Sequence, residues 1–170
     1  MMRNFFKGKA ELLLRNVVFG IEDSLVSTVG LLSGIAIAGI SAGTIILTGT
    51  VLILVEAFSM AVGSFLSEDS VQMYVLRDKN SYFVSIMGGI AMFFSYFIAG
   101  FIPLLPYIFF PAIDAFWLSI AVTLLALFLL GAFSAEIFRA HYFRQGLKMF
   151  LVGGMAIAIG ILVGRLAEHI

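Results

Sequence analysis

The sequence predicts an all-α integral membrane protein with five transmembrane helices. Hydrophobic residues make up 62% of its 170 residues, and charged residues only 12%. A soluble domain of this size carries about a quarter charged residues. The apolar residues gather in five segments, each close to the roughly 20 residues that a helix needs to cross the hydrocarbon core. These segments are 16–40, 44–66, 82–104, 115–137 and 149–167, and together they predict one transmembrane domain.

The limits of the segments follow from length and from helix breakers. As one helix, the uncharged run 24–55 would be about 48 Å long, too long for a bilayer, so a tight turn at 39–43 is expected to divide it. The third segment is expected to end at Pro103 and Pro106, because proline lacks the N–H that continues a helix. The polar stretch 67–81 is long enough for a helical extension and a turn.

Basic residues predict the orientation. Five crossings put the N-terminus and the connections 67–81 and 138–148 on one side, which then carries nine of the ten basic residues. The positive-inside rule makes that side cytoplasmic and places the C-terminus outside. The nine are Arg3, Lys7, Lys9, Arg15, Arg77, Lys79, Arg139, Arg144 and Lys148, and Arg165 is the tenth.

Composition also restricts the function. The net charge is zero, which gives no indication of a nucleic-acid partner, and the absence of cysteine excludes disulfides and thiolate metal ligands. No nucleophile–base pair, cofactor loop or catalytic metal motif is present, so we expect no enzyme activity and no bound cofactor. No apolar signal-peptide core follows the basic N-terminus, and the small size without a targeting segment favours a prokaryotic cell membrane.

Ionisable residues inside the apolar segments are the strongest functional signal. Glu22 and Asp23 lie in the first segment, and Glu56 lies in the middle of the second. A carboxylate in hydrocarbon costs at least about 2.5–3.5 kcal/mol, so such residues usually face a polar interior and mark an ion or substrate path. Ion transport is therefore the first hypothesis.

Sequence register places these residues in layers. In a hairpin with equal rises, Asp23 and Met60 lie at about the same depth, and Ser27 and Glu56 lie one turn deeper. The pairs 23/27 and 56/60 are spaced i, i+4, so each pair stacks on one face of its helix. Two carboxylates, a thioether and a hydroxyl suit a divalent transition metal such as Fe²⁺ or Mn²⁺. Protons would compete with the metal for the carboxylate oxygens, as an exchanger requires.

The candidate metal ligands are therefore Asp23, Glu56 and Met60. Residues that could support this site, or collect cations at its cytoplasmic mouth, are Glu22, Ser27, Glu68, Asp69 and Met73. Structural alternatives stay open for them. Asp23 could pair with a buried partner, Met60 could fill a gap in the core, and the acidic residues after the second segment could be a solvated helix end.

Small residues recur every four positions on three of the segments. At this spacing they let helix backbones approach closely in lipid. Packing within the bundle is the simpler interpretation, and a self-complementary seam of a homodimer is the other. The residues are Gly30, Gly34 and Ala38, then Ser59 and Gly63, then Gly160 and Gly164.

Two motifs resemble those of the vacuolar iron transporter family, also called the CCC-type family. Residues 19–27, FGIEDSLVS, resemble its Gly-x-x-Asp-Gly-Leu-Val-Ser signature, and residues 58–67, FSMAVGSFLS, resemble its second-helix pattern Ser-Met-x-x-Gly-x-Tyr-Leu-Ser. Ser24 stands where the family has glycine. The family's upstream second-helix glutamate aligns with Leu52, whereas this chain has Glu56 one turn nearer Met60. Weaker similarity extends over 99–107 and 144–165.

The resemblance implies a five-helix homodimer that exchanges Fe²⁺, and sometimes Mn²⁺, for protons, with Asp23 and Met60 lining the path. Plant-type members insert a long metal-binding domain between helices two and three, where this chain has only 67–81. We predict a bilayer-embedded homodimer that exports Fe²⁺ or Mn²⁺ from the cytoplasm by proton antiport. A channel-like carrier, and a non-transporting scaffold or metal-sensing or assembly protein, are the alternatives.

Overall fold

The protein forms five helices within residues 2–75, 82–137 and 140–167, which its computed structural model describes. The helices are α1 (Met2–Ile37), α2 (Ala42–Val75), α3 (Tyr82–Phe109), α4 (Ala112–Ile137) and α5 (Tyr142–Ala167). Each is long and apolar enough to cross a membrane. The predicted class, an all-α membrane protein with five spans, is confirmed.

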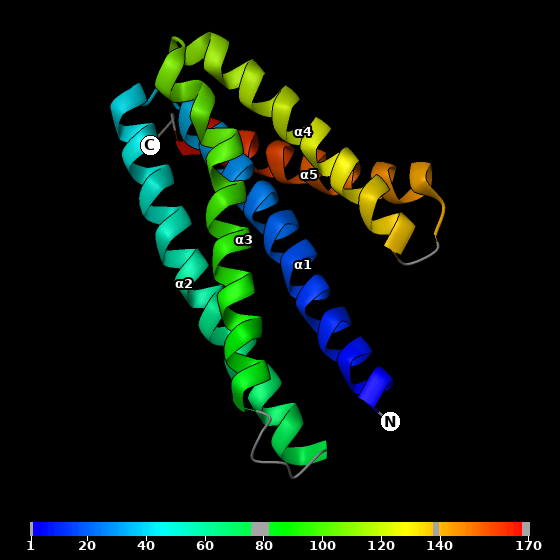
Figure 1. The fold of residues 1–170 in the computed structure, drawn as a ribbon. Coiled ribbons are helices and arrows are strands. Elements are labelled where there is room, and N and C mark those ends of the chain that lie inside the picture. Colours follow the sequence, from blue (N-terminus) through cyan, green and yellow to red (C-terminus); the bar gives the residue numbers. More distant parts are fainter. Residues whose placement is uncertain (1, 76–81, 138–139, 168–170) are drawn as a thin grey trace.

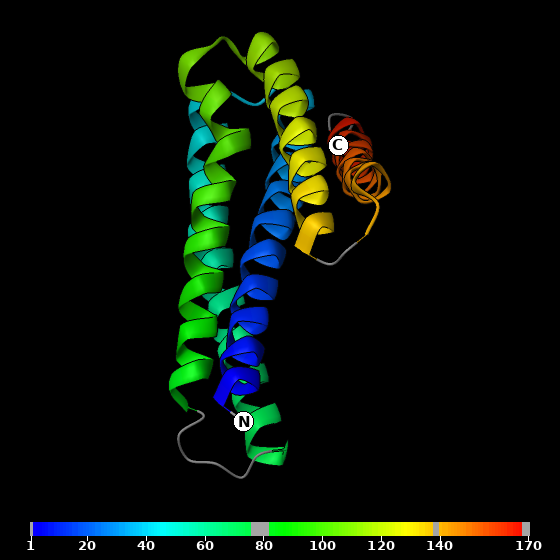
Figure 2. The same cartoon turned by 45° about the vertical axis from the view of Figure 1, so that its right-hand side comes forward.

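The helices are arranged as a bundle of three and an inclined pair. In Figure 1, α1, α2 and α3 run side by side, whereas α4 and α5 lean away from them. Figure 2 shows α5 nearly end-on beside α4, at the side of the bundle. Helix α1 is central, because it packs against each of the other four helices. The orientation in the membrane stays a prediction, since Arg77, Lys79 and Arg139 lie outside the described residues.

The helices extend beyond the predicted spans. Helix α2 has 34 residues, or about 51 Å at 1.5 Å per residue, so it projects past a hydrocarbon core of about 30 Å. Helix α1 already begins at Met2, and α5 begins at Tyr142 rather than at 149. Polar residues end a membrane span without ending the helix, so apolarity alone misplaces the helix limits.

The expectation that α3 ends at Pro103 and Pro106 is wrong. Both prolines lie inside the helix, which continues to Phe109. Proline withdraws only its own N–H, and transmembrane helices tolerate it where neighbouring groups bond the local backbone. Ser119 Oγ on α4 donates a hydrogen bond of 2.6 Å to the Pro103 carbonyl and so fastens this part of α3 to α4. The connection to α4 shrinks to residues 110–111.

The predicted turn between α1 and α2 has a glycine at the position that needs one. Gly39 has a φ of +73°, a left-handed conformation that costs other residues about 1–2 kcal/mol. Ile40 N–H donates to Ile35 O at 3.4 Å, which closes the end of α1. Ser41 Oγ then accepts the Thr44 N–H at 3.3 Å and caps the start of α2.

Glycines allow α1 and α5 to touch along their backbones. A Cβ on Gly34 would lie 2.8 Å from the Gly160 carbonyl oxygen, and a Cβ on Gly30 would lie 3.2 Å from that of Ala156. These small residues therefore pack within one chain, as the simpler interpretation holds. The similar spacing on α2 has no such use in the chain, because a Cβ on Gly63 would meet only open space.

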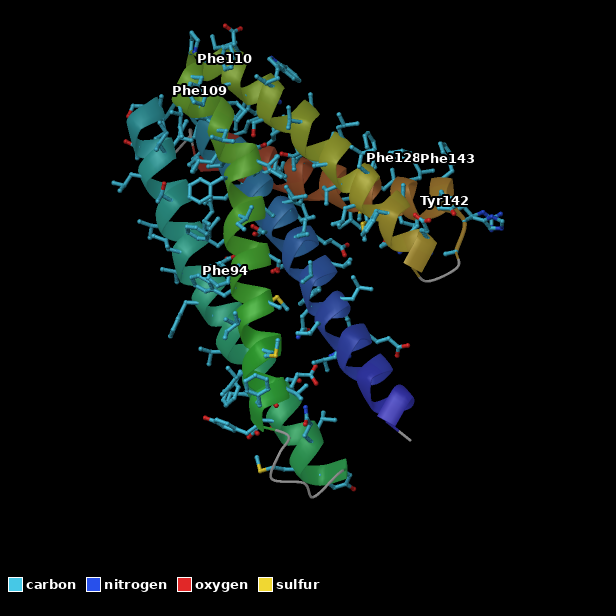
Figure 3. All side chains as sticks on the ribbon, in the orientation of Figure 1. Phe94, Phe109, Phe110, Phe128, Tyr142 and Phe143 are labelled. Atoms are coloured by element: carbon cyan, nitrogen blue, oxygen red, sulfur yellow. The ribbon has the colours of Figure 1, made fainter. Side chains whose placement is uncertain are left out.

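Large apolar side chains cover the outside of the molecule. In Figure 3, Phe109 and Phe110 mark the α3–α4 turn, and Phe94 lies farther down α3; all three are exposed. Phe128 and Phe143 meet edge to face between α4 and α5, with ring centroids 6.1 Å apart. Water-soluble proteins rarely expose apolar surface this widely. Lipid is the solvent that such a surface suits.

Candidate metal site

Glu56 belongs to a hydrogen-bonded group that joins three helices. From α3, the Tyr96 hydroxyl donates to Glu56 Oε2 on α2. Ser27 Oγ on α1 lies 2.6 Å from the same hydroxyl. Because the single hydrogen of the Tyr96 hydroxyl is donated to Glu56, Ser27 is the donor in this second bond. Ser24 Oγ, also on α1, donates to the Tyr96 backbone oxygen at 2.7 Å. A fully buried tyrosine thus ties the first three helices together around a carboxylate.

Ser24 shows how the close contact between α1 and α3 is built. A Cβ on Gly100 of α3 would lie 2.9 Å from Ser24 Oγ, so the missing side chain on α3 makes room for the serine on α1. Ser24 is fully buried. The serine that replaces the family's glycine in the first-helix motif therefore adds a hydrogen bond at the helix contact without separating the helices.

Glu56 and Ser27 line a cavity of about 650 Å³ between α1, α2 and α5, which we name the glutamate cavity. Among the described residues that line it, these two alone have polar side chains, and Leu52 lines it one turn from Glu56. Their shared depth agrees with the equal-rise register. The family's second-helix glutamate aligns with Leu52, and this chain has Glu56 instead. Both positions therefore line the same cavity.

Met60 opens into a different cavity. This space of about 400 Å³ lies between α1, α2 and α3, and we name it the methionine cavity because Met60 and Met92 both line it. Asn16 and an ion pair between Arg15 and Glu68 also line it. The two cavities occupy opposite directions along α1, the methionine cavity at residues 15–19 and the glutamate cavity at residues 26–38.

Asp23 lies on α1 between the two cavities and lines neither. It is half-buried, and its carboxyl group interacts electrostatically with Glu56, while that of Glu22 interacts with Asp23. Across the described parts of the chain, no three histidine or carboxylate side chains come close enough to hold one metal ion. Met60 lines the methionine cavity and Glu56 the glutamate cavity, so Asp23, Glu56 and Met60 stay a predicted ligand set.

The predicted cluster at the cytoplasmic mouth is divided. Glu68 turns inward, is 6% exposed and pairs with Arg15. Asp69 is partly exposed, and Met73 is 64% exposed. Only the first of the three acts at a cavity wall in this structure.

Sequence reasoning missed Tyr96, which holds Glu56. A usable signal was present, because α3 otherwise carries phenylalanine in this region, at 93, 94, 97 and 101. A buried tyrosine hydroxyl almost always has a partner. One tyrosine in the middle of a phenylalanine-rich span therefore points to a polar group on a neighbouring helix. Met92 and Asn16 were missed as well, since neither residue type stands out in a span.

The fold and the site define a multi-pass membrane protein with ionisable side chains held between its first three helices. The chain belongs to the VIT family, whose model matches residues 14–82 and 76–165. This confirms the resemblance of the first two helix motifs. The chain is 33% identical over 76 residues to vacuolar iron transporter 1 of Arabidopsis thaliana, a match that covers 44% of this chain and 30% of that protein. The match thus spans less than a third of the relative's length.

Proposed function

We propose that this protein transports a divalent transition-metal ion, Fe²⁺ or Mn²⁺, across a membrane. Membership of the VIT family and the similarity to a protein named as a vacuolar iron transporter support metal transport. The observation that carries the proposal is Glu56, a carboxylate in the middle of a span that faces a cavity and is held there by Tyr96. Keeping a carboxylate at this depth is costly unless it serves an ion path.

Asp23, Glu56 and Met60 are the proposed ligands. Carboxylate oxygens bind Fe²⁺ and Mn²⁺, and the thioether disfavours Mg²⁺ and Ca²⁺. Because the three residues lie in succession along the hairpin, we infer that an ion from the methionine cavity passes Asp23 before it reaches Glu56. When the ion leaves, a buried carboxylate cannot cheaply remain charged and unpaired, so a proton replaces the metal. This exchange is the basis of proton antiport.

We further propose a homodimer that exports metal from the cytoplasm of a prokaryotic cell. The glutamate cavity is walled by α2 on one side and α5 on the other, and apart from Glu56 and Ser27 the described residues of its lining are apolar. A second copy over this cavity would shield Glu56 from lipid. The excess of basic residues near the N-terminus supports a cytoplasmic N-terminus.

The test is metal flux into proteoliposomes, with Mn²⁺ as the probe and a pH-sensitive dye inside. We expect an imposed pH gradient to drive Mn²⁺ movement, and Asp23→Asn and Glu56→Gln each to reduce the flux roughly tenfold or more, as loss of a metal-site residue typically does. Glu136→Gln is the matched control, since Glu136 is exposed at the end of α4.

Two results would favour the other functions. Flux that ignores the pH gradient would indicate a channel-like carrier. No flux, together with no effect of Mn²⁺ on thermal unfolding in detergent, would indicate a non-transporting scaffold or sensor.

A further inference from the structure

The methionine cavity contains a buried carboxylate that is paired with a positively charged side chain. Arg15 Nη2 donates to Glu68 Oε1 across the gap between α1 and α2. The two partners differ sharply in exposure, because the Arg15 side chain is 66% exposed and that of Glu68 only 8%. The guanidinium can therefore leave for water at little cost, whereas the carboxylate cannot.

The same cavity contains buried polar groups without a partner. Asn16 is 4% exposed, yet within the described part of the chain its Nδ2 has no hydrogen-bond partner, and neither has Ser64 Oγ. The two face a common point, because a Cβ on Gly88 would lie 2.9 Å from Asn16 Nδ2 and 3.8 Å from Ser64 Oγ. The oxygen and nitrogen of an asparagine amide can be exchanged by rotating the group. Asn16 can therefore offer an oxygen ligand as readily as a donor.

Two thioethers also line the cavity. Met60 enters from α2 and Met92 from α3, where Met92 is 2% exposed. With a volume of about 400 Å³, the cavity can hold a metal ion with several of its waters, each of which needs about 30 Å³. One carboxylate, two neutral oxygen donors and two thioethers form a mixed set that suits a borderline-soft divalent cation better than Mg²⁺ or Ca²⁺.

We propose that the methionine cavity is a second cation site, in which a divalent transition-metal ion binds Glu68 by displacing Arg15. Asn16, Ser64 and the two thioethers are the further donors. The ion's identity rests on the proposed function, but its binding requires no transport. Arg15 holds the place of the metal while the site is empty and thereby closes the cavity mouth. Each arriving ion opens it by exchanging one cation for another on the same carboxylate.

The energetics favour exchange over a fixed structural tie. A pair with one mostly exposed partner contributes little to stability. A buried carboxylate that loses every cation is strongly destabilising. Glu68 therefore tolerates the loss of Arg15 only when another cation takes its place, and that condition makes the arginine responsive to metal.

The test is Co²⁺ binding to the tag-free protein in detergent, measured by isothermal titration calorimetry. The background variant carries Asp23→Asn and Glu56→Gln, which removes the two deeper carboxylates. We expect it to keep one Co²⁺ site. Adding Glu68→Gln should weaken that site at least about tenfold, and adding Arg15→Gln should tighten it about tenfold, as expected for a charge-assisted bond of roughly 1.4 kcal/mol.

Two controls change the same charges elsewhere. Asp69→Asn removes the carboxylate next in sequence to Glu68, and Arg144→Gln removes an exposed basic residue of α5. Each should alter Co²⁺ affinity less than about twofold, since neither residue lines the cavity. Equal tightening by Arg144→Gln would reduce the Arg15 effect to general electrostatics and overturn the proposal.

A further variant separates binding from folding. Met92→Leu preserves the volume and removes the sulfur, so it should weaken Co²⁺ and leave Mg²⁺ binding unchanged. If Glu68→Gln fails to fold, Met92→Leu and Arg15→Gln decide the matter. If neither of these two variants changes the Co²⁺ affinity, the proposed site is contradicted. Cavity binding with no Mn²⁺ flux in proteoliposomes would instead reject the proposed transport and leave this site standing.

Discussion

Replacing Tyr96 with phenylalanine tests whether the hydrogen-bonded group around Glu56 holds the first three helices together. The change keeps the fully buried ring and removes only the hydroxyl that serves Glu56 and Ser27. A hydrogen bond to a charged group is worth about 1.5–3 kcal/mol in soluble proteins, and side-chain bonds in membranes average about 0.6 kcal/mol. We expect a loss of about 2 kcal/mol, between these limits for the two bonds together.

For a chain of this size, that loss corresponds to a drop in Tm of about 4–8 °C. Scanning calorimetry in detergent measures it directly, whereas thiol-reactive dyes cannot, because the chain has no cysteine. Tyr107→Phe is the matched control. Tyr107 is 2% exposed on the same helix, and its hydroxyl lies near Ser119 without a well-formed hydrogen bond. Equal Tm changes for the two variants would refute the assigned role of Tyr96.

Three further changes test the packing of the helices, each by Tm in detergent. Gly160→Ala should lower stability by about 1–3 kcal/mol, because its Cβ would collide with the α1 backbone, whereas Gly154→Ala meets open space and should not. Gly39→Ala should cost about 1 kcal/mol at its positive φ, and Gly43→Ala, at the start of α2, should be neutral or stabilising. Ser119→Ala removes the bond to the α3 backbone and should cost about 0.6 kcal/mol, and an unchanged Tm would show that bond to be dispensable.

The sequence predicted the five spans and the hairpin because both depend on local properties. Span length follows from apolar content, and the first turn follows from Gly39 and its cap at Ser41. The limits of α1 and α5 could not be predicted in this way, because a helix outside the membrane is not ended by polar residues. The prolines of α3 misled because each removes a single backbone donor, and a transmembrane helix can continue past such a loss.

The sequence predicted the depth of the candidate ligands along the helices but not the cavity into which each side chain opens. Equal rises along the hairpin brought Ser27 and Glu56 to one level, and the Tyr96 hydroxyl reaches both. The i, i+4 spacing of Glu56 and Met60 predicted one shared face. In three dimensions α2 lies against α3 more than against α1, so Glu56 opens toward α5 and Met60 opens toward α3. The cavity that a side chain lines depends on how the helices cross, and the sequence of one helix does not determine the crossing.

The position of Glu68 connects stability to function. Spacing alone groups it with Asp69 and Met73 as a solvated helix end, but α2 continues past the membrane and turns this one carboxylate against α1. Once buried, it needs a positive charge at all times, and Arg15 supplies one from the water side. In the proposed exchange the buried carboxylate is never left without a positive charge, because the metal takes the place that Arg15 leaves. In this proposal a basic residue at the mouth of a cation path takes the place of the absent metal, so its positive charge is compatible with cation uptake.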